Sequence, residues 1–133
     1  MALAKGMGAK RALPLAVSVA CHTPLMGGAA ERLAAALEAT TFHRPWAPVV
    51  SNALAAPVED PGEIKAALMK QLTSPVRWVE SVWAMVAGGV SAMLEVGPQA
   101  VVGGLVKRID AGVALYAVTD RASLDAFDAG ALG

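Results

Sequence analysis

The sequence contains one cysteine, few aromatic residues and little charge. A single cysteine excludes an intramolecular disulfide framework and any zinc module built from several cysteines. Charged residues make up 17% of the chain, and the 11 basic and 11 acidic side chains cancel. This balance excludes a strongly basic nucleic-acid-binding protein and an acidic solvating tail, so we predict no nucleic-acid partner.

The chain is instead rich in apolar residues, since 56% of its 133 residues are hydrophobic and most of these are alanine, valine or leucine. Such a chain can bury enough apolar surface to fold, which excludes intrinsic disorder. Its length suits one domain or part of a larger one. The apolar excess indicates that something else covers part of this chain.

Residues 12–30 contain no Asp, Glu, Lys or Arg, and a helix of this length could span a bilayer. Pro14, Pro24 and Gly27 lie inside this stretch, and its polar groups would have to be buried in lipid. We therefore predict no transmembrane helix and no membrane partner.

A lipoprotein signal is an alternative interpretation of the same stretch. Basic residues precede an apolar run that ends at Cys21, as they do in such signals. Against it, Pro14 interrupts the run, and Ser18 stands where a lipoprotein signal has a large aliphatic residue. The alternative remains open at this point.

The pattern of apolar residues switches repeatedly between strand and helix periods. Strands are predicted over residues 12–19, 48–51, 90–96 and 113–118, and helices over 1–7, 24–39, 60–72, 74–87, 99–108 and 123–129. In the third of these helices, Asp60, Pro61 and Glu63 provide an N-cap, a first-turn proline and a capping-box acid. The alternation predicts an α/β fold with a parallel sheet and flanking helices on both faces.

His22 is the first candidate for chemistry, because it follows the first predicted strand directly. The carboxyl end of a strand is where active sites of open α/β sheets lie. A structural histidine bonded to a nearby carbonyl is the commoner role for a lone histidine, and both interpretations stay open.

The sequence around His22 favours neither a nucleophilic Cys21 nor a bound metal. No basic group lies within one helical turn of Cys21 to lower the thiol pKa, so a small inert residue is favoured over a nucleophile. Adjacent residues on a strand point to opposite faces, which argues against Cys21, His22 and His43 as metal ligands. We predict no metal site.

Gln71 is the second candidate, since it continues the apolar stripe of Ile64 and Leu68. A buried amide needs hydrogen-bond partners. Gln71 also lies in the last turn of a predicted helix, where backbone carbonyls lack intrahelical donors. A glutamine at the edge of the stripe, reaching out to solvent, is an equal alternative.

Two further segments could carry chemistry. Residues 95–105 join a strand to a helix through glycine and proline, a weak indication of an anion-binding helix start; a simple turn is the default. Residues 89–93 come nearest to a serine nucleophile elbow, but they lack its second glycine and fall in a predicted strand. The chain thus has a candidate base without a nucleophile.

Four strings in this order, KRALPLAVSVACHTPLM, PVVSN, QLTSPVRWVESV and EVGPQAVVGGLVKRI, resemble the C-terminal half of bacterial malonyl-CoA:acyl-carrier-protein transacylases. The resemblance covers the chain from about Lys5 onward. It implies residues 1–17 as the end of a small ferredoxin-like subdomain and 18–133 as the C-terminal part of the acyltransferase α/β-hydrolase-like core. It also implies a cytoplasmic enzyme of fatty-acid biosynthesis.

The resemblance implies a serine–histidine acyl transfer from malonyl-CoA to the phosphopantetheine thiol of acyl carrier protein. It places the general base on His22 and the carbonyl that orients the imidazole on Gln71. Asn52 and Cys21 are implied to lie near the substrate, Cys21 at a position that varies with acyl selectivity. No resident cofactor is implied, because the coenzyme A thioester is a substrate.

The sequence departs from the family in two respects. The family's G-P-G-K is Gly97-Pro98-Gln99-Ala100 here, which affects the turn and not the chemistry. The serine of the G-H-S-x-G elbow, the oxyanion-hole glutamine and the malonyl-binding arginine belong to an N-terminal half that we expect as a partner. Arg11, Arg32 and Arg44 match none of these motifs. The alternative is a non-catalytic or split fragment without activity on its own.

Overall fold

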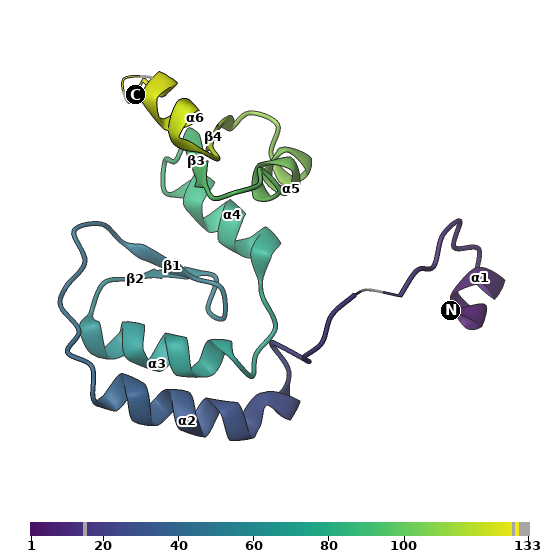
Figure 1. Ribbon diagram of the computed structural model, residues 1–133, viewed down its shortest axis with the longest axis horizontal. Helices are drawn as coiled ribbons and strands as arrows, with labels where there is room; N and C mark the ends of the chain where they lie inside the picture. Colours follow the sequence, from purple (N-terminus) through teal and green to yellow (C-terminus); the bar gives the residue numbers. More distant parts are fainter. Residues whose placement is uncertain (15, 129, 131–133) are drawn as a thin grey trace.

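The computed structural model describes residues 1–14, 16–128 and 130 (Figure 1). Its helices are α1 (Ala2–Gly6), the short 3-10 helix η1 (Pro24–Met26), α2 (Gly27–Glu38), α3 (Pro61–Gln71), α4 (Trp78–Ala87), α5 (Val102–Ile109) and α6 (Arg121–Ala126). Its strands are β1 (Val49–Ser51), β2 (Ala56–Val58), β3 (Ala92–Val96) and β4 (Ala114–Val118).

Strands β3 and β4 form the parallel sheet that the sequence predicts. They pair in register from Ala92 beside Ala114 to Val96 beside Val118, and α5 is the helix that connects them. Val82 of α4, Val106 of α5 and Val113 form the buried core of this unit. The α/β class with a parallel sheet and flanking helices is therefore confirmed.

Strands β1 and β2 form an antiparallel hairpin over α3, and α2 packs along α3 on the other side (Figure 1). The strands predicted from the sequence include none over residues 52–59, so β2 was missed. Pro57 lies in this strand and pairs with Val50 in a two-stranded hairpin. Such an edge position tolerates proline.

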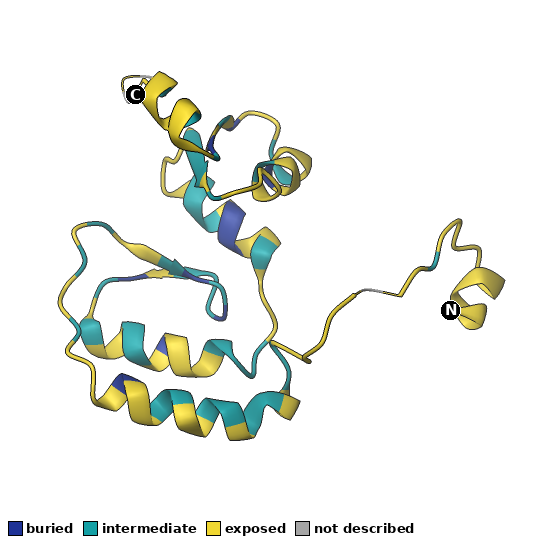
Figure 2. Ribbon diagram, in the orientation of Figure 1, coloured by how far each residue is buried: buried dark blue, intermediate teal, exposed yellow. Residues whose placement is uncertain are grey.

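The strand predicted over residues 12–19 is wrong for the residues described there; Leu15 lies outside them. The stretch is extended but pairs with no strand, and it leads away from the rest of the chain to α1 (Figure 1). Val17 and Val19 are exposed. Figure 2 shows almost all of the described part of this stretch coloured as exposed. A strand needs a neighbour to satisfy its backbone groups, and no described strand lies beside this one.

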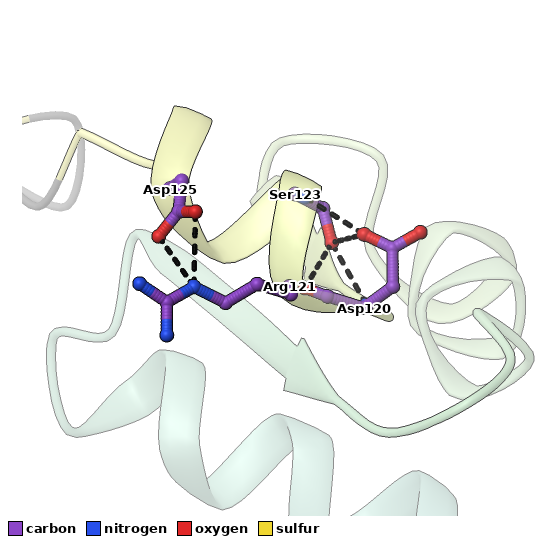
Figure 3. A network of polar contacts seen from close by, with 4 residues as sticks. All are labelled: Asp120, Arg121, Ser123 and Asp125. Carbon is purple, nitrogen blue, oxygen red and sulfur yellow. Dashed lines mark hydrogen bonds and ion pairs between the residues drawn. The ribbon is translucent and has the colours of Figure 1, made fainter.

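Helices α3 and α6 begin directly after a capping aspartate. The Asp60 carboxylate accepts from the backbone N–H groups of Gly62 and Glu63, which confirms the predicted N-cap of α3. The return bond from the Glu63 side chain, expected of a capping box, is not found among the described residues. A capping box does form at α6, where Asp120 and Ser123 bond reciprocally (Figure 3).

Helices α4, α5 and α6 begin at other residues than expected, and α5 begins at Val102 rather than at Gln99. Helix α6 begins at Arg121 rather than at Ser123, because Asp120 caps it; an ion pair between Arg121 and Asp125 adds to its first turns (Figure 3). Its predicted end, Ala129, lies outside the described residues. Helix α4 begins at Trp78 and not at Ser74.

Candidate active site

The candidate base His22 sits in a tight turn just before η1. Its backbone has a φ of 62°, in the left-handed region that non-glycine residues rarely adopt. The turn is held by the Thr23 hydroxyl, which donates to the Ala20 carbonyl at 2.8 Å and accepts from the Leu25 N–H at 3.3 Å. The backbone N–H of His22 donates to the Leu72 carbonyl at 3.1 Å. His22 is therefore fastened to the end of α3.

The imidazole is fixed by the same helix end. Nδ1 of His22 lies 2.9 Å from the Gln71 carbonyl oxygen. A carbonyl only accepts, so Nδ1 carries the proton, and in the neutral ring Nε2 keeps its lone pair. The imidazole is thus oriented with its basic nitrogen directed away from α3.

The Gln71 carbonyl is available because Gln71 is the last residue of α3. Its weak partner within the chain is the Ser74 N–H at 3.4 Å. The hydrogen bond that the resemblance implied is therefore present, and it is made by the backbone. This carbonyl is the last-turn group that the sequence indicated at Gln71. The half-buried Gln71 side chain lies elsewhere and lines a small cavity between α3 and the hairpin.

The position of His22 corrects one expectation. It does not follow a strand, since none forms among the described residues before it. The C-terminal turn of α3 places it instead. The Leu72 carbonyl, which sequence reasoning missed, accepts the second hydrogen bond that holds His22 to α3. Its position at the end of the helix is the signal that could have indicated it.

Asn52 and Cys21 are not brought against the imidazole by any described contact. Cys21 is exposed, with a free thiol. Asn52 lies in the β1–β2 turn, where its carbonyl accepts from the Arg77 N–H at 2.9 Å. The Arg77 guanidinium also donates to the Leu54 carbonyl at 3.0 Å. Arg77, which sequence reasoning did not single out, thus ties this turn to the start of α4.

The possible anion site at the start of α5 is occupied by the chain itself. The Glu95 carboxylate accepts from the backbone N–H groups of Val101, Val102 and Gly103, at 2.8–2.9 Å. These bonds, that from Val102 first, hold the pKa of the Glu95 carboxyl below its ordinary value. The helix start is thus an internal cap and not a site for a ligand.

Two other kinds of site are absent from the described part of the chain. No three His, Cys, Asp or Glu side chains gather there as metal ligands could. Nor is any helix in those residues both long and apolar enough to cross a membrane.

Curated proteins similar to this chain are transacylases. The chain is 46% identical to the malonyl CoA-acyl carrier protein transacylase of Haemophilus influenzae, over 96% of this chain and 41% of that protein. It is 42% identical to the Bacillus subtilis protein of the same name, over 92% of this chain and 39% of that protein. The chain thus spans about two fifths of the length of these relatives. No family model matches it.

Solved structures similar to this chain are also enzymes that transfer malonyl groups. The acyl-carrier-protein S-malonyltransferase from Burkholderia pseudomallei superposes with a TM-score of 0.86 at 44% identity, covering 94% of this chain and 41% of the other. A malonyl-transacylase in complex with a type II PKS acyl-carrier protein superposes with a TM-score of 0.84 at 47% identity, covering 91% and 39%.

Proposed function

We propose that this chain, which belongs to the malonyl-CoA:acyl-carrier-protein transacylase family, supplies the base-bearing part of a serine acyltransferase site. The observation that carries the proposal is the bond from His22 Nδ1 to the Gln71 carbonyl. A base must be held in one tautomer with its free nitrogen available, and this contact does both.

The end of α3 replaces the acid that orients histidine in many serine enzymes. When Nε2 takes a proton the ring becomes a cation, and Nδ1–H still donates to Gln71. The carbonyl end of a helix carries partial negative charge, which stabilises a nearby imidazolium. A neutral backbone group can therefore orient the base and support its charged form.

The proposed reaction runs in two acyl transfers. His22 Nε2 takes the proton of a serine hydroxyl as its oxygen attacks the malonyl-CoA thioester carbon. The C–S bond breaks, and the coenzyme A thiolate receives that proton. The phosphopantetheine thiol of acyl carrier protein then passes its proton to His22 and attacks the ester, and the serine oxygen leaves and is reprotonated.

The relatives' names and the solved complex with an acyl-carrier protein support these substrates. The proposed chemistry uses the coenzyme A thioester as a substrate and calls for no resident cofactor or metal. We place Asn52 and Cys21 near the acyl group as substrate-binding residues, and we assign residues 1–17 and 18–133 to the two family subdomains. The family's role in fatty-acid synthesis supports a location in the cytoplasm.

The serine and the oxyanion donors come from elsewhere, because no G-H-S-x-G string occurs in this sequence. We propose that they lie in a polypeptide equivalent to the part of the relatives that this chain does not match. Without that polypeptide the chain carries a base with no nucleophile to activate.

The test is reconstitution with the unmatched portion of the Haemophilus influenzae relative. The pair should transfer malonyl from malonyl-CoA to acyl carrier protein, and His22→Ala should lower the rate by a hundredfold or more. Gln71→Ala is the matched control: it keeps the backbone carbonyl and should cost only a few-fold. Transfer by this chain alone, or a pair indifferent to His22→Ala, would overturn the proposal.

A further inference from the structure

Two non-glycine residues among those described have a positive φ, and they lie in different turns. One is His22, and the other is Ala55, with a φ of 54°, in the turn between β1 and β2. A left-handed alanine is strained, and such a conformation persists only where the surrounding structure holds it. Because strained backbone gathers at functional sites, the β1–β2 turn is a candidate for a role in the site.

Hydrogen bonds from inside and outside hold this turn. The Ala55 N–H donates to the Ser51 carbonyl at 2.7 Å, and the Leu54 N–H donates to the hydroxyl of the same serine at 3.3 Å. From outside, the Arg77 guanidinium donates to the Leu54 carbonyl at 3.0 Å. That carbonyl belongs to the peptide group that leads into Ala55, so the arginine acts directly on the strained residue.

Arg77 is itself held at the start of α4. Its carbonyl accepts from the Ser81 N–H at 2.9 Å and from the Ser81 hydroxyl at 2.8 Å, and Ser81 is buried. Its N–H donates to the Asn52 carbonyl at 2.9 Å, and its half-exposed guanidinium also pairs with Glu80 at 3.2 Å. Arg77 thus holds the turn at two carbonyls, those of Asn52 and Leu54.

The same arginine connects this turn to the helix end that holds His22. Leu72, whose carbonyl accepts from the His22 N–H, begins the segment 72–77 that ends at Arg77. Pro75 lies in that segment, and a proline fixes its own φ and restricts the residue before it. The segment is therefore short and stiff, so the bonds of Arg77 fix the turn relative to His22.

The Asn52 side chain is the group in this turn that can meet a substrate. Its backbone carbonyl bonds to Arg77, whereas its side-chain amide makes no hydrogen bond to the described residues; the residue is half-buried. An amide offers two donors and an acceptor, which suit the carboxylate and the thioester carbonyl of a malonyl group. The direction of this side chain follows from the backbone of the turn.

We propose that Arg77 is a positioning residue for the acyl-transfer site. Its guanidinium holds the β1–β2 turn in the conformation that presents the Asn52 amide to the malonyl group, so Asn52 contacts the substrate and Arg77 acts through it. The inference rests on the proposed function, because the substrate and the place of Asn52 come from there. It does not require His22 to be the base.

The test measures binding of malonyl-CoA without turnover. The chain is reconstituted with the unmatched portion of the Haemophilus influenzae relative, and every chain carries His22→Ala to suppress transfer. Calorimetry gives Kd and the fraction of molecules that bind. Arg77→Met should raise Kd about fivefold at an unchanged binding fraction, since fewer molecules hold the turn in the binding conformation at any moment. A role confined to folding would lower that fraction and leave Kd unchanged.

Two further variants show how Arg77 acts. Asn52→Ala should raise Kd about tenfold, because a hydrogen bond to the substrate is lost. In that background Arg77→Met should add less than about twofold, since its effect passes through Asn52. Glu80→Gln is the matched control: it removes only an exposed ion pair of Arg77, so Kd should stay within about twofold.

Hydrogen exchange in the chain alone measures the turn itself. The Leu54 and Ala55 amides should exchange faster in Arg77→Met than in the parent chain, and at the parent rate in Glu80→Gln. Equal exchange in Arg77→Met and the parent, an unchanged Kd, or a full fivefold effect added to that of Asn52→Ala would overturn the inference.

The failure of the proposed function is recognised separately. A pair that binds malonyl-CoA as expected, but whose transfer rate is the same with His22 and with His22→Ala, would contradict the proposed function and leave this inference standing. A pair that does not bind malonyl-CoA would overturn both.

Discussion

Nδ1 of His22 and the carbonyl oxygen of Gln71 lie 2.9 Å apart, although the two residues are 49 positions apart in sequence. A second bond, from the His22 N–H to the Leu72 carbonyl, fastens the backbone to the same helix end. The two bonds depend on where α3 ends and on the left-handed turn at His22. Both conditions can be perturbed separately.

The left-handed backbone at His22 predicts a difference between two truncations. His22→Gly and His22→Ala both lose the imidazole bond, but only glycine adopts a φ of 62° without strain. His22→Gly should therefore be more stable than His22→Ala by about 1 kcal/mol, measured by denaturant unfolding.

Ala35→Gly is the control for glycine itself. Ala35 lies exposed within α2, where glycine should destabilise by about 1 kcal/mol. The comparison at both positions is glycine against alanine. If glycine is less stable than alanine at position 22 as well as at position 35, the backbone at His22 is not strained.

The N-cap of α3 is expected to stabilise the helix whose last residue, Gln71, contacts His22. Asp60→Ala removes the acceptor of two backbone N–H groups and should cost about 1 kcal/mol of stability. Asp60→Asn keeps a capping oxygen and should cost much less. Hydrogen exchange across residues 61–72 measures the difference. Equal exchange in the two variants would show that the cap does not hold α3.

The carboxylate of Glu95 predicts a dependence of stability on pH. Its folded-state pKa is below the ordinary 4.5 because Val102 and its neighbours donate to the charged form. Its contribution is present above the unfolded pKa and is lost as the pH falls through the folded value. Glu95→Gln should therefore differ most from the parent chain near neutral pH, and the difference should shrink in acid below about pH 4.5.

Unfolding of parent and variant from pH 7 to pH 3 checks this window. Glu31→Gln is the control, since the Glu31 side chain makes no hydrogen bond to the described residues and lies exposed on α2. A Glu95→Gln deficit that stays constant down to the acid end would contradict the assignment.

The exposed apolar side chains predict self-association of the isolated chain. Leu13, Val17, Val79 and Trp83 are among the large apolar residues that remain exposed. Apolar patches above a few hundred Å² mark surfaces that associate. Sedimentation velocity should show concentration-dependent species, and an apolar dye should bind. A monodisperse monomer with a sharp melt and no dye binding would contradict this.

The exposed thiol of Cys21 allows the lipoprotein interpretation to be tested. A segment of a cytoplasmic transacylase should keep residues 1–20 and carry no lipid. Intact mass spectrometry of the chain expressed in a bacterium measures both. Cleavage before Cys21 with an added diacylglycerol would overturn the assignment of the stretch.

Local signals in the sequence determined most of the elements. Asp60 and Pro61 indicated where α3 begins, and the apolar runs around Ala92 and Ala114 indicated the two parallel strands. The four motifs also indicated the family and placed His22 and Gln71 in one site. These features depend on short-range capping and periodicity, which a sequence displays directly.

The tertiary structure decided what depends on partners distant in the chain. It made Pro57 part of a hairpin and Glu95 the cap of α5. It also left the described residues between 12 and 19 without a strand, because a strand exists only beside another. It also brought the Gln71 carbonyl to 2.9 Å from His22 Nδ1, across 49 positions of sequence. The sequence by itself indicated His22 as the candidate base and the Gln71 carbonyl as its partner. Only the fold decided that the Leu72 carbonyl holds the His22 backbone, because that bond joins residues distant in the chain.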